Sequence, residues 1–60
     1  MKNYRVDVFF RGIAHYKTEF EEYWLAKVFA EAVKDEEGVE SVYILQRMSD
    51  TKFDITKRIK

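Results

Sequence analysis

Apolar and polar side chains alternate along the first third of the chain. From Lys2 to Val8 the apolar positions are even-numbered, namely Tyr4, Val6 and Val8, and the adjacent pair Phe9 and Phe10 follows them. The alternation resumes from Ile13 to Phe20. A period of two over β-branched and aromatic residues is typical of a strand with one buried face. The sequence therefore predicts two strands here.

The glycine between these two segments predicts a tight hairpin. Both strands keep their apolar side chains on one face only if the loop has an odd number of residues. A three-residue loop, Phe10–Gly12, meets this condition, and its last position suits a residue with a left-handed backbone. The expected cross-strand pairs are Val8–Ala14, Val6–Tyr16 and Tyr4–Thr18 on one face, and Phe9–Ile13 and Asp7–His15 on the other.

The middle of the chain has the spacing of an amphipathic helix, from Glu21 to about Glu36. Its predicted buried stripe follows the i, i+3, i+4, i+7 pattern and consists of Leu25, Val28, Phe29 and Ala32. Trp24 is expected at the edge of the core. The segment Thr18–Glu21 matches a capping box, so the helix has an alternative start one turn earlier. Gly38 is expected to end it.

Two further strands are predicted after the helix, over residues 39–47 and 52–59. In the first, Val42 and Ile44 are expected to face the helix, which leaves Tyr43 and Leu45 on the other side. In the second, the residues expected to face inward, opposite Ile44 and Val42, are Phe53 and Ile55, and this pairing leaves a four-residue loop, Arg47–Asp50. The residues expected to face outward are Lys52, Asp54, Thr56 and Arg58.

The resulting order is ββαββ, within a single domain spanning residues 1–60. Because the helix reverses the chain direction, the third strand lies antiparallel to the first and beside it. The fold class is thus α+β, a four-stranded antiparallel sheet of order 2-1-3-4 with one helix packed on one face. A single helix of about four turns leaves the opposite face of the sheet open.

The charges cancel in total but not along the chain. Eleven basic and eleven acidic residues give a net charge of zero. Residues 1–18 and 41–60 are each basic, whereas residues 19–40 are strongly acidic. One side of the molecule is therefore expected to be negative and another positive. Three carboxylates, Asp35, Glu36 and Glu37, fall at the helix C-terminus, where the helix dipole disfavours negative charge.

The open sheet face is the principal candidate interaction surface. An apolar strip is expected at its centre, formed by Phe9, Ile13, Tyr43 and Leu45. Its charged rim is expected to include Arg5, Arg47 and Arg58. Contiguous exposed apolar surface marks interaction sites, and a self-complementary face suits a two-fold homodimer.

Two other partners fit the same pattern. Aromatic rings for base stacking and arginines for phosphates make single-stranded nucleic acid the alternative partner of the open face. The acidic helix side, with Asp35, Glu36 and Glu37, could instead meet another protein, as in a small regulator or inhibitor. In size and style the chain is similar to small phage and prophage accessory proteins, although no diagnostic residue carries that similarity.

No arrangement of residues indicates catalysis. His15 is the only histidine, and its expected role is a cross-strand pair with Asp7. One histidine without cysteine makes no zinc site, and no glycine-rich loop is present to hold a cofactor phosphate. The sequence thus predicts a non-enzymatic protein with no catalytic, cofactor or metal site.

The composition also predicts a location. The absence of cysteine suits a reducing compartment. The N-terminus does not resemble a signal peptide, and no segment approaches the length of a membrane span. A cytoplasmic protein without a membrane partner is expected.

Overall fold

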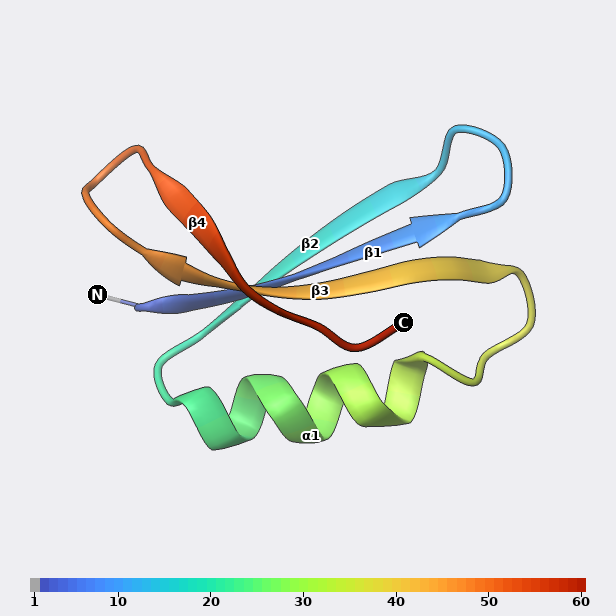
Figure 1. Cartoon of the computed structure of the whole chain (residues 1–60), viewed down its shortest axis with the longest axis horizontal. Helices are drawn as coiled ribbons and strands as arrows, with labels where there is room; N and C mark the ends of the chain where they lie inside the picture. The colour runs from blue at the N-terminus through green and yellow to red at the C-terminus, as the bar shows by residue number, and fades with distance from the viewer. Residues whose placement is uncertain (1) are drawn as a thin grey trace.

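A computed structural model describes residues 2–60, and it confirms the predicted fold class and strand order. The elements are β1 (Tyr4–Phe10), β2 (His15–Phe20), α1 (Tyr23–Val33), β3 (Val39–Arg47) and β4 (Phe53–Arg58). They form a four-stranded sheet of order β2-β1-β3-β4, in which every neighbouring pair is antiparallel. The sheet is strongly twisted, and α1 lies along one side of it (Figure 1).

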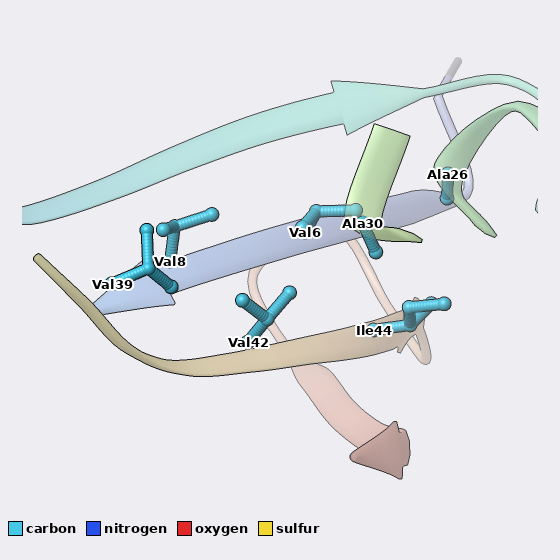
Figure 2. Packing of buried hydrophobic residues seen from close by; sticks show 7 residues of the cluster. All are labelled: Val6, Val8, Ala26, Ala30, Val39, Val42 and Ile44. Carbon is cyan, nitrogen blue, oxygen red and sulfur yellow. The ribbon is translucent and has the colours of Figure 1, made fainter. Parts of the chain in front are cut away.

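The core lies between this helix and the two central strands. Even-numbered valines and an isoleucine of β1 and β3 point toward α1, which meets them with two alanines (Figure 2). Ala26 and Ala30 are fully buried, and their small side chains let the helix backbone approach the sheet closely. The sheet contributes to this core Val6, Val8, Val39, Val42 and Ile44.

The β1–β2 hairpin has the expected parity but a register shifted by two residues. Val8 lies opposite Tyr16 rather than Ala14, and the three-residue loop is 11–13. Phe10 stays in the strand because its ring packs edge-on against Tyr16, with centroids 5.4 Å apart. Gly12, with a φ of 84°, occupies the middle of the loop. The prediction that Phe10 belongs to the turn is therefore wrong.

The helix is shorter than predicted, and its buried face is rotated. It begins at Tyr23 after Glu22, which has an extended backbone and makes no side-chain cap. The alternative capping box is absent because Thr18 lies within β2. The half-buried side chains beside the two core alanines are those of Tyr23, Phe29 and Val33.

Four helix residues predicted for the core or its edge, Trp24, Leu25, Val28 and Ala32, are instead exposed. Trp24 and Val28 are each 62% exposed, and Leu25 is 37% exposed. The helix has more apolar positions than one face can bury. The face that packs against the sheet is the one that carries Ala26 and Ala30. The predicted stripe is therefore wrong for Leu25, Val28 and Ala32, and the predicted core-edge position of Trp24 is wrong as well. Gly38, predicted to end the helix, lies beyond its last residue, Val33, and occupies the turn directly before β3 with a φ of 88°.

The first side chains of β4 point to the opposite face of the sheet from the one predicted. Phe53 pairs with Arg47, and Ile55 pairs with Leu45, so both lie on the open face. The loop holds five residues, 48–52, rather than four, which reverses the parity. A register shift between Ile44 and Leu45 then returns Arg58 to the open face, opposite Tyr43. The other three residues predicted to face outward do not lie on the open face of β4. Lys52 precedes the strand, and Asp54 pairs with Gln46, which puts it on the helix side. Thr56 lies at the register shift and has no paired residue in β3.

Candidate interaction surfaces

A partly buried ion pair lies near the centre of the open face. Asp7 is only 6% exposed, although it is on the side of the sheet away from α1. Arg5 donates from Nε to Oδ1 at 2.7 Å and from Nη2 to Oδ2 at 3.0 Å. This two-pronged contact is the strong form of an arginine–carboxylate interaction. Throughout residues 2–60, no buried side-chain polar atom lacks a hydrogen-bond partner.

Phe53 connects this ion pair to a second arginine. The guanidinium carbons of Arg5 and Arg47 each lie 4.5 Å from the centroid of the Phe53 ring. Arg47 also donates from Nη2 to Glu19 Oε1 at 2.9 Å and from Nε to the Lys2 carbonyl at 2.8 Å. Both guanidiniums are thus held by groups of the same chain.

The remaining aromatic rings of the open face contact one another. Phe9 stacks on His15 with centroids 4.0 Å apart, and it meets Tyr43 edge-on at 5.9 Å. The guanidinium carbon of Arg58 lies over the Tyr43 ring, 5.5 Å from its centroid. His15 Nε2 is 3.7 Å from Asp7 Oδ2, which is beyond hydrogen-bond distance. The expected direct Asp7–His15 pairing is replaced by Asp7–Lys17.

The predicted apolar strip is only partly assembled. Phe9 and Tyr43 do lie together on the open face, and both are half-buried. Ile13 is not on this face, because it sits in the hairpin loop and is fully exposed. Leu45 is on the face but only 6% exposed, so it offers almost no surface to a partner.

All three predicted rim arginines lie on the open face, and one aromatic residue was missed there. The missed residue is Phe53, the ring that contacts Arg5 and Arg47. Ile55, 62% exposed, was missed for the same reason. The face of both residues depends on whether the β3–β4 loop has four or five residues, and the alternation within β4 does not determine that number.

A groove of about 400 Å³ separates α1 from β2 on the helix side of the sheet. Most of its wall is apolar, and one rim is Tyr16, which is 61% exposed. The residues that line it are Val8, Phe10, Tyr16, Thr18, Phe29, Ala32, Val33 and Glu36.

The outer side of α1 carries a second apolar surface, here called the helix patch and made of Trp24, Leu25 and Val28. At 3.6 residues per turn, Trp24 and Val28 lie opposite the buried alanines. They point away from the sheet, and both are 62% exposed. The helix patch is the largest group of exposed apolar side chains on one element of the described chain.

Charged groups lie beside the helix patch. Lys34 Nζ is 2.7 Å from Glu31 Oε1, one turn apart along α1. The hydrogen bond from Lys34 and its positive charge lower the pKa of Glu31. The same bond and the negative charge of Glu31 raise the pKa of Lys34. Both side chains are therefore held in their charged forms at neutral pH.

The acidic cluster of Asp35, Glu36 and Glu37 occupies the turn after α1, and all three residues are exposed. The backbone N–H of Glu36 bonds to the Val33 carbonyl at 3.0 Å, which closes the turn. Lys60 Nζ donates to the carbonyls of Lys34 and Val39, at 3.0 and 2.8 Å. A positive charge therefore lies at this helix end, where it compensates for the unfavourable carboxylates.

Within residues 2–60, no group of three or more histidine, cysteine, aspartate or glutamate side chains is arranged to hold a metal ion. No helix in the same range is long and apolar enough to cross a membrane. No protein-family model, no curated protein and no solved structure matches the chain.

Proposed function

We propose that this chain is a non-enzymatic protein-interaction domain that binds another protein through the helix patch. The observation that carries the proposal is the exposure of Trp24 and Val28, 62% each, on the side of α1 away from the sheet. Exposed aromatic and aliphatic side chains grouped on one helix are typical of interface centres, and tryptophan is enriched among the residues that dominate binding energy.

The helix patch is better suited to binding than the open sheet face. The open-face dimer predicted from the sequence has lost two of its four apolar residues, since Ile13 lies in a loop and Leu45 is buried. The rings that would stack on nucleic-acid bases contact this chain's own side chains, as Phe53 does with Arg5 and Arg47. Binding a base or a phosphate there would first require breaking those contacts.

The charges around the helix patch define the chemistry of the partner. Glu21 and Glu22 precede the helix, and the acidic cluster follows it. A partner with an apolar recess bordered by lysine or arginine would bury the tryptophan and pair with these carboxylates. A small protein of this kind would act as a regulator or inhibitor of its partner. We place it in the cytoplasm, on the basis that it contains no cysteine.

The first experiment compares the proteins captured from a source-cell lysate by the wild-type chain and by Trp24→Glu. A protein that only the wild type retains is then purified and titrated against both chains. Trp24 is the only tryptophan of the chain, so its emission should shift to shorter wavelength when the partner buries it. We expect Trp24→Glu to weaken the affinity by at least about 30-fold, as for a residue at the centre of an interface.

The matched control is Met48→Glu, which changes an exposed apolar residue in the loop between β3 and β4. Met48 is 57% exposed, close to the value for Trp24. Its substitution should leave the affinity within about twofold of the wild type, as expected away from an interface centre. The proposal is wrong if Trp24→Glu retains the same proteins with the same affinity as the wild type, or if Met48→Glu loses binding equally.

A further inference from the structure

Strand β2 offers a free and regular edge. It pairs only with β1, and every residue from His15 to Glu19 is exposed. Its pairing with β1 contains no register shift, whereas the other edge strand, β4, is distorted by the shift between Ile44 and Leu45. Edge strands are protected by such irregularities, and a regular free edge is a template for another strand.

The direction of the free backbone groups follows from the hairpin. Phe10 N–H donates to the Ala14 carbonyl at 2.9 Å, so these two residues form a hydrogen-bonded pair. Hydrogen-bonded and non-bonded pairs alternate along an antiparallel ladder. Tyr16 and Thr18 therefore direct their backbone groups toward β1. His15, Lys17 and Glu19 direct theirs outward.

We propose that two copies of this chain pair antiparallel along β2, with Thr18 opposite Thr18 of the second copy. In this register Lys17 lies opposite Glu19 of the second copy, and Glu19 lies opposite Lys17 of the second copy. These are the residues whose backbone groups point outward, so each such pair exchanges two backbone hydrogen bonds. The two-fold axis thus forms two ion pairs and places two threonines together, all favourable cross-strand combinations.

The neighbouring registers that keep the same faces are electrostatically worse. A shift of one residue in each strand places Lys17 opposite Lys17 of the second copy. A shift of one residue in the other direction places Glu19 opposite Glu19 of the second copy. Like charges directly opposite each other are destabilising, so the sequence of β2 selects the threonine-centred register. This charge complementarity identifies a second copy of the chain as the occupant of the edge.

The helix side of β2 supports the same pairing. In the threonine-centred register, Tyr16 lies opposite Phe20 of the second copy. Tyr16 already contacts Phe10, and Phe20 contacts Phe29 of α1 with centroids 5.3 Å apart. Pairing would join these aromatic contacts across the two-fold axis and cover the groove between α1 and β2. The 61% exposure of Tyr16 is thereby reduced.

Sedimentation of charge-reversed chains tests this dimer. The wild type is expected to have twice the mass of one chain at high micromolar concentration. Lys17→Glu and Glu19→Lys each place like charges opposite each other at both pairs, and each should raise the dissociation constant roughly tenfold. Glu19→Lys also removes the acceptor of the hydrogen bond from Arg47 within its own chain, so circular dichroism must show that this variant is folded. A mixture of the two variants should dimerise again, because Glu at position 17 of one chain then faces Lys at position 19 of the other.

Two further variants control for folding. Glu37→Lys makes the same charge change in an exposed turn away from β2, and it should dimerise as the wild type does. Lys17→Pro removes an outward N–H without removing a bond to β1, so it should be a folded monomer by circular dichroism. A monomeric wild type, a mixture that fails to associate, or a dimeric Lys17→Pro would each overturn the proposal. None of these results bears on the helix patch, which is on another element.

Discussion

At the scale of single residues, Arg5 has two roles on the open face. Its guanidinium forms both hydrogen bonds to the carboxylate of Asp7, and it lies 4.5 Å from the centroid of Phe53. A carboxylate that is 6% exposed would be costly without this partner, because little water remains to solvate it. Arg5 thereby stabilises a buried charge and covers an aromatic ring at the same time.

Replacing Arg5 by methionine is expected to lower the free energy of unfolding by about 2–4 kcal/mol, since it leaves the buried charge of Asp7 without its partner. A domain of this size has only a few kcal/mol of stability, so the variant should be largely unfolded. The double variant Arg5→Met/Asp7→Asn should recover part of the loss. Urea denaturation followed by circular dichroism measures both. Arg11→Met, in the exposed hairpin loop, should match the wild type, and an unchanged Arg5→Met would refute this account.

At the scale of the elements, the periodicity was sufficient to locate four strands and one helix and to order them. The alternation in β1 and β3 also assigned their faces, because Val6, Val8, Val42 and Ile44 all lie in the core. These strands are central, with neighbours on both sides, and their burial follows directly from a period of two.

The pattern of apolar and polar residues could not predict which side of the sheet the β4 side chains point to, or which face of α1 is buried. Phe53 and Ile55 alternate as a buried strand would, but a five-residue loop rather than a four-residue one reverses their direction. In α1, apolar residues occur all around the helix, so several stripes fit the sequence. The face that is buried depends on how closely the backbones approach, and Ala26 and Ala30 permit the closest contact. Both outcomes are set by tertiary packing.

Two valines test this rotation of α1. Val42→Ala removes two buried methyl groups from the centre of β3 and is expected to cost about 2–3 kcal/mol, including the cavity. Val28→Ala changes a residue that is 62% exposed and should alter the free energy of unfolding by less than about 0.5 kcal/mol. Thermal and urea unfolding of both variants provides the comparison. A large loss for Val28→Ala would mean that the sequence-predicted stripe is the buried one.

At the scale of the whole molecule, the uneven charge along the chain becomes a charge separation in space. The acidic residues before and after α1 lie on the helix side, whereas arginines such as Arg5, Arg47 and Arg58 lie on the opposite face of the sheet. On the open face, Asp7 and Glu19 pair with Arg5 and Arg47, so the stronger charge imbalance is the excess of carboxylates around α1. A basic partner would be attracted to the helix side more than to the open face.

The last residue of the chain links the sheet to this acidic side. Beyond β4, Ile59 N–H donates to the Val42 carbonyl at 2.8 Å, and the chain then runs back beside the end of α1 (Figure 1). There Lys60 Nζ donates to the carbonyls of Lys34 and Val39. Its ammonium group thus connects β3, β4 and the helix C-terminus.

Substituting Lys60 by methionine should therefore destabilise the whole fold. Loss of the two charge-assisted bonds at a partly exposed site is expected to cost about 1 kcal/mol, which lowers the melting temperature by roughly 5 °C. The loss should be larger at low salt, because the charges after α1 are then screened less. Calorimetry at two salt concentrations measures this effect, with Lys52→Met in the exposed β3–β4 loop as the control. Equal melting temperatures for Lys60→Met and the wild type would show that the carboxylates after α1 need no compensating charge.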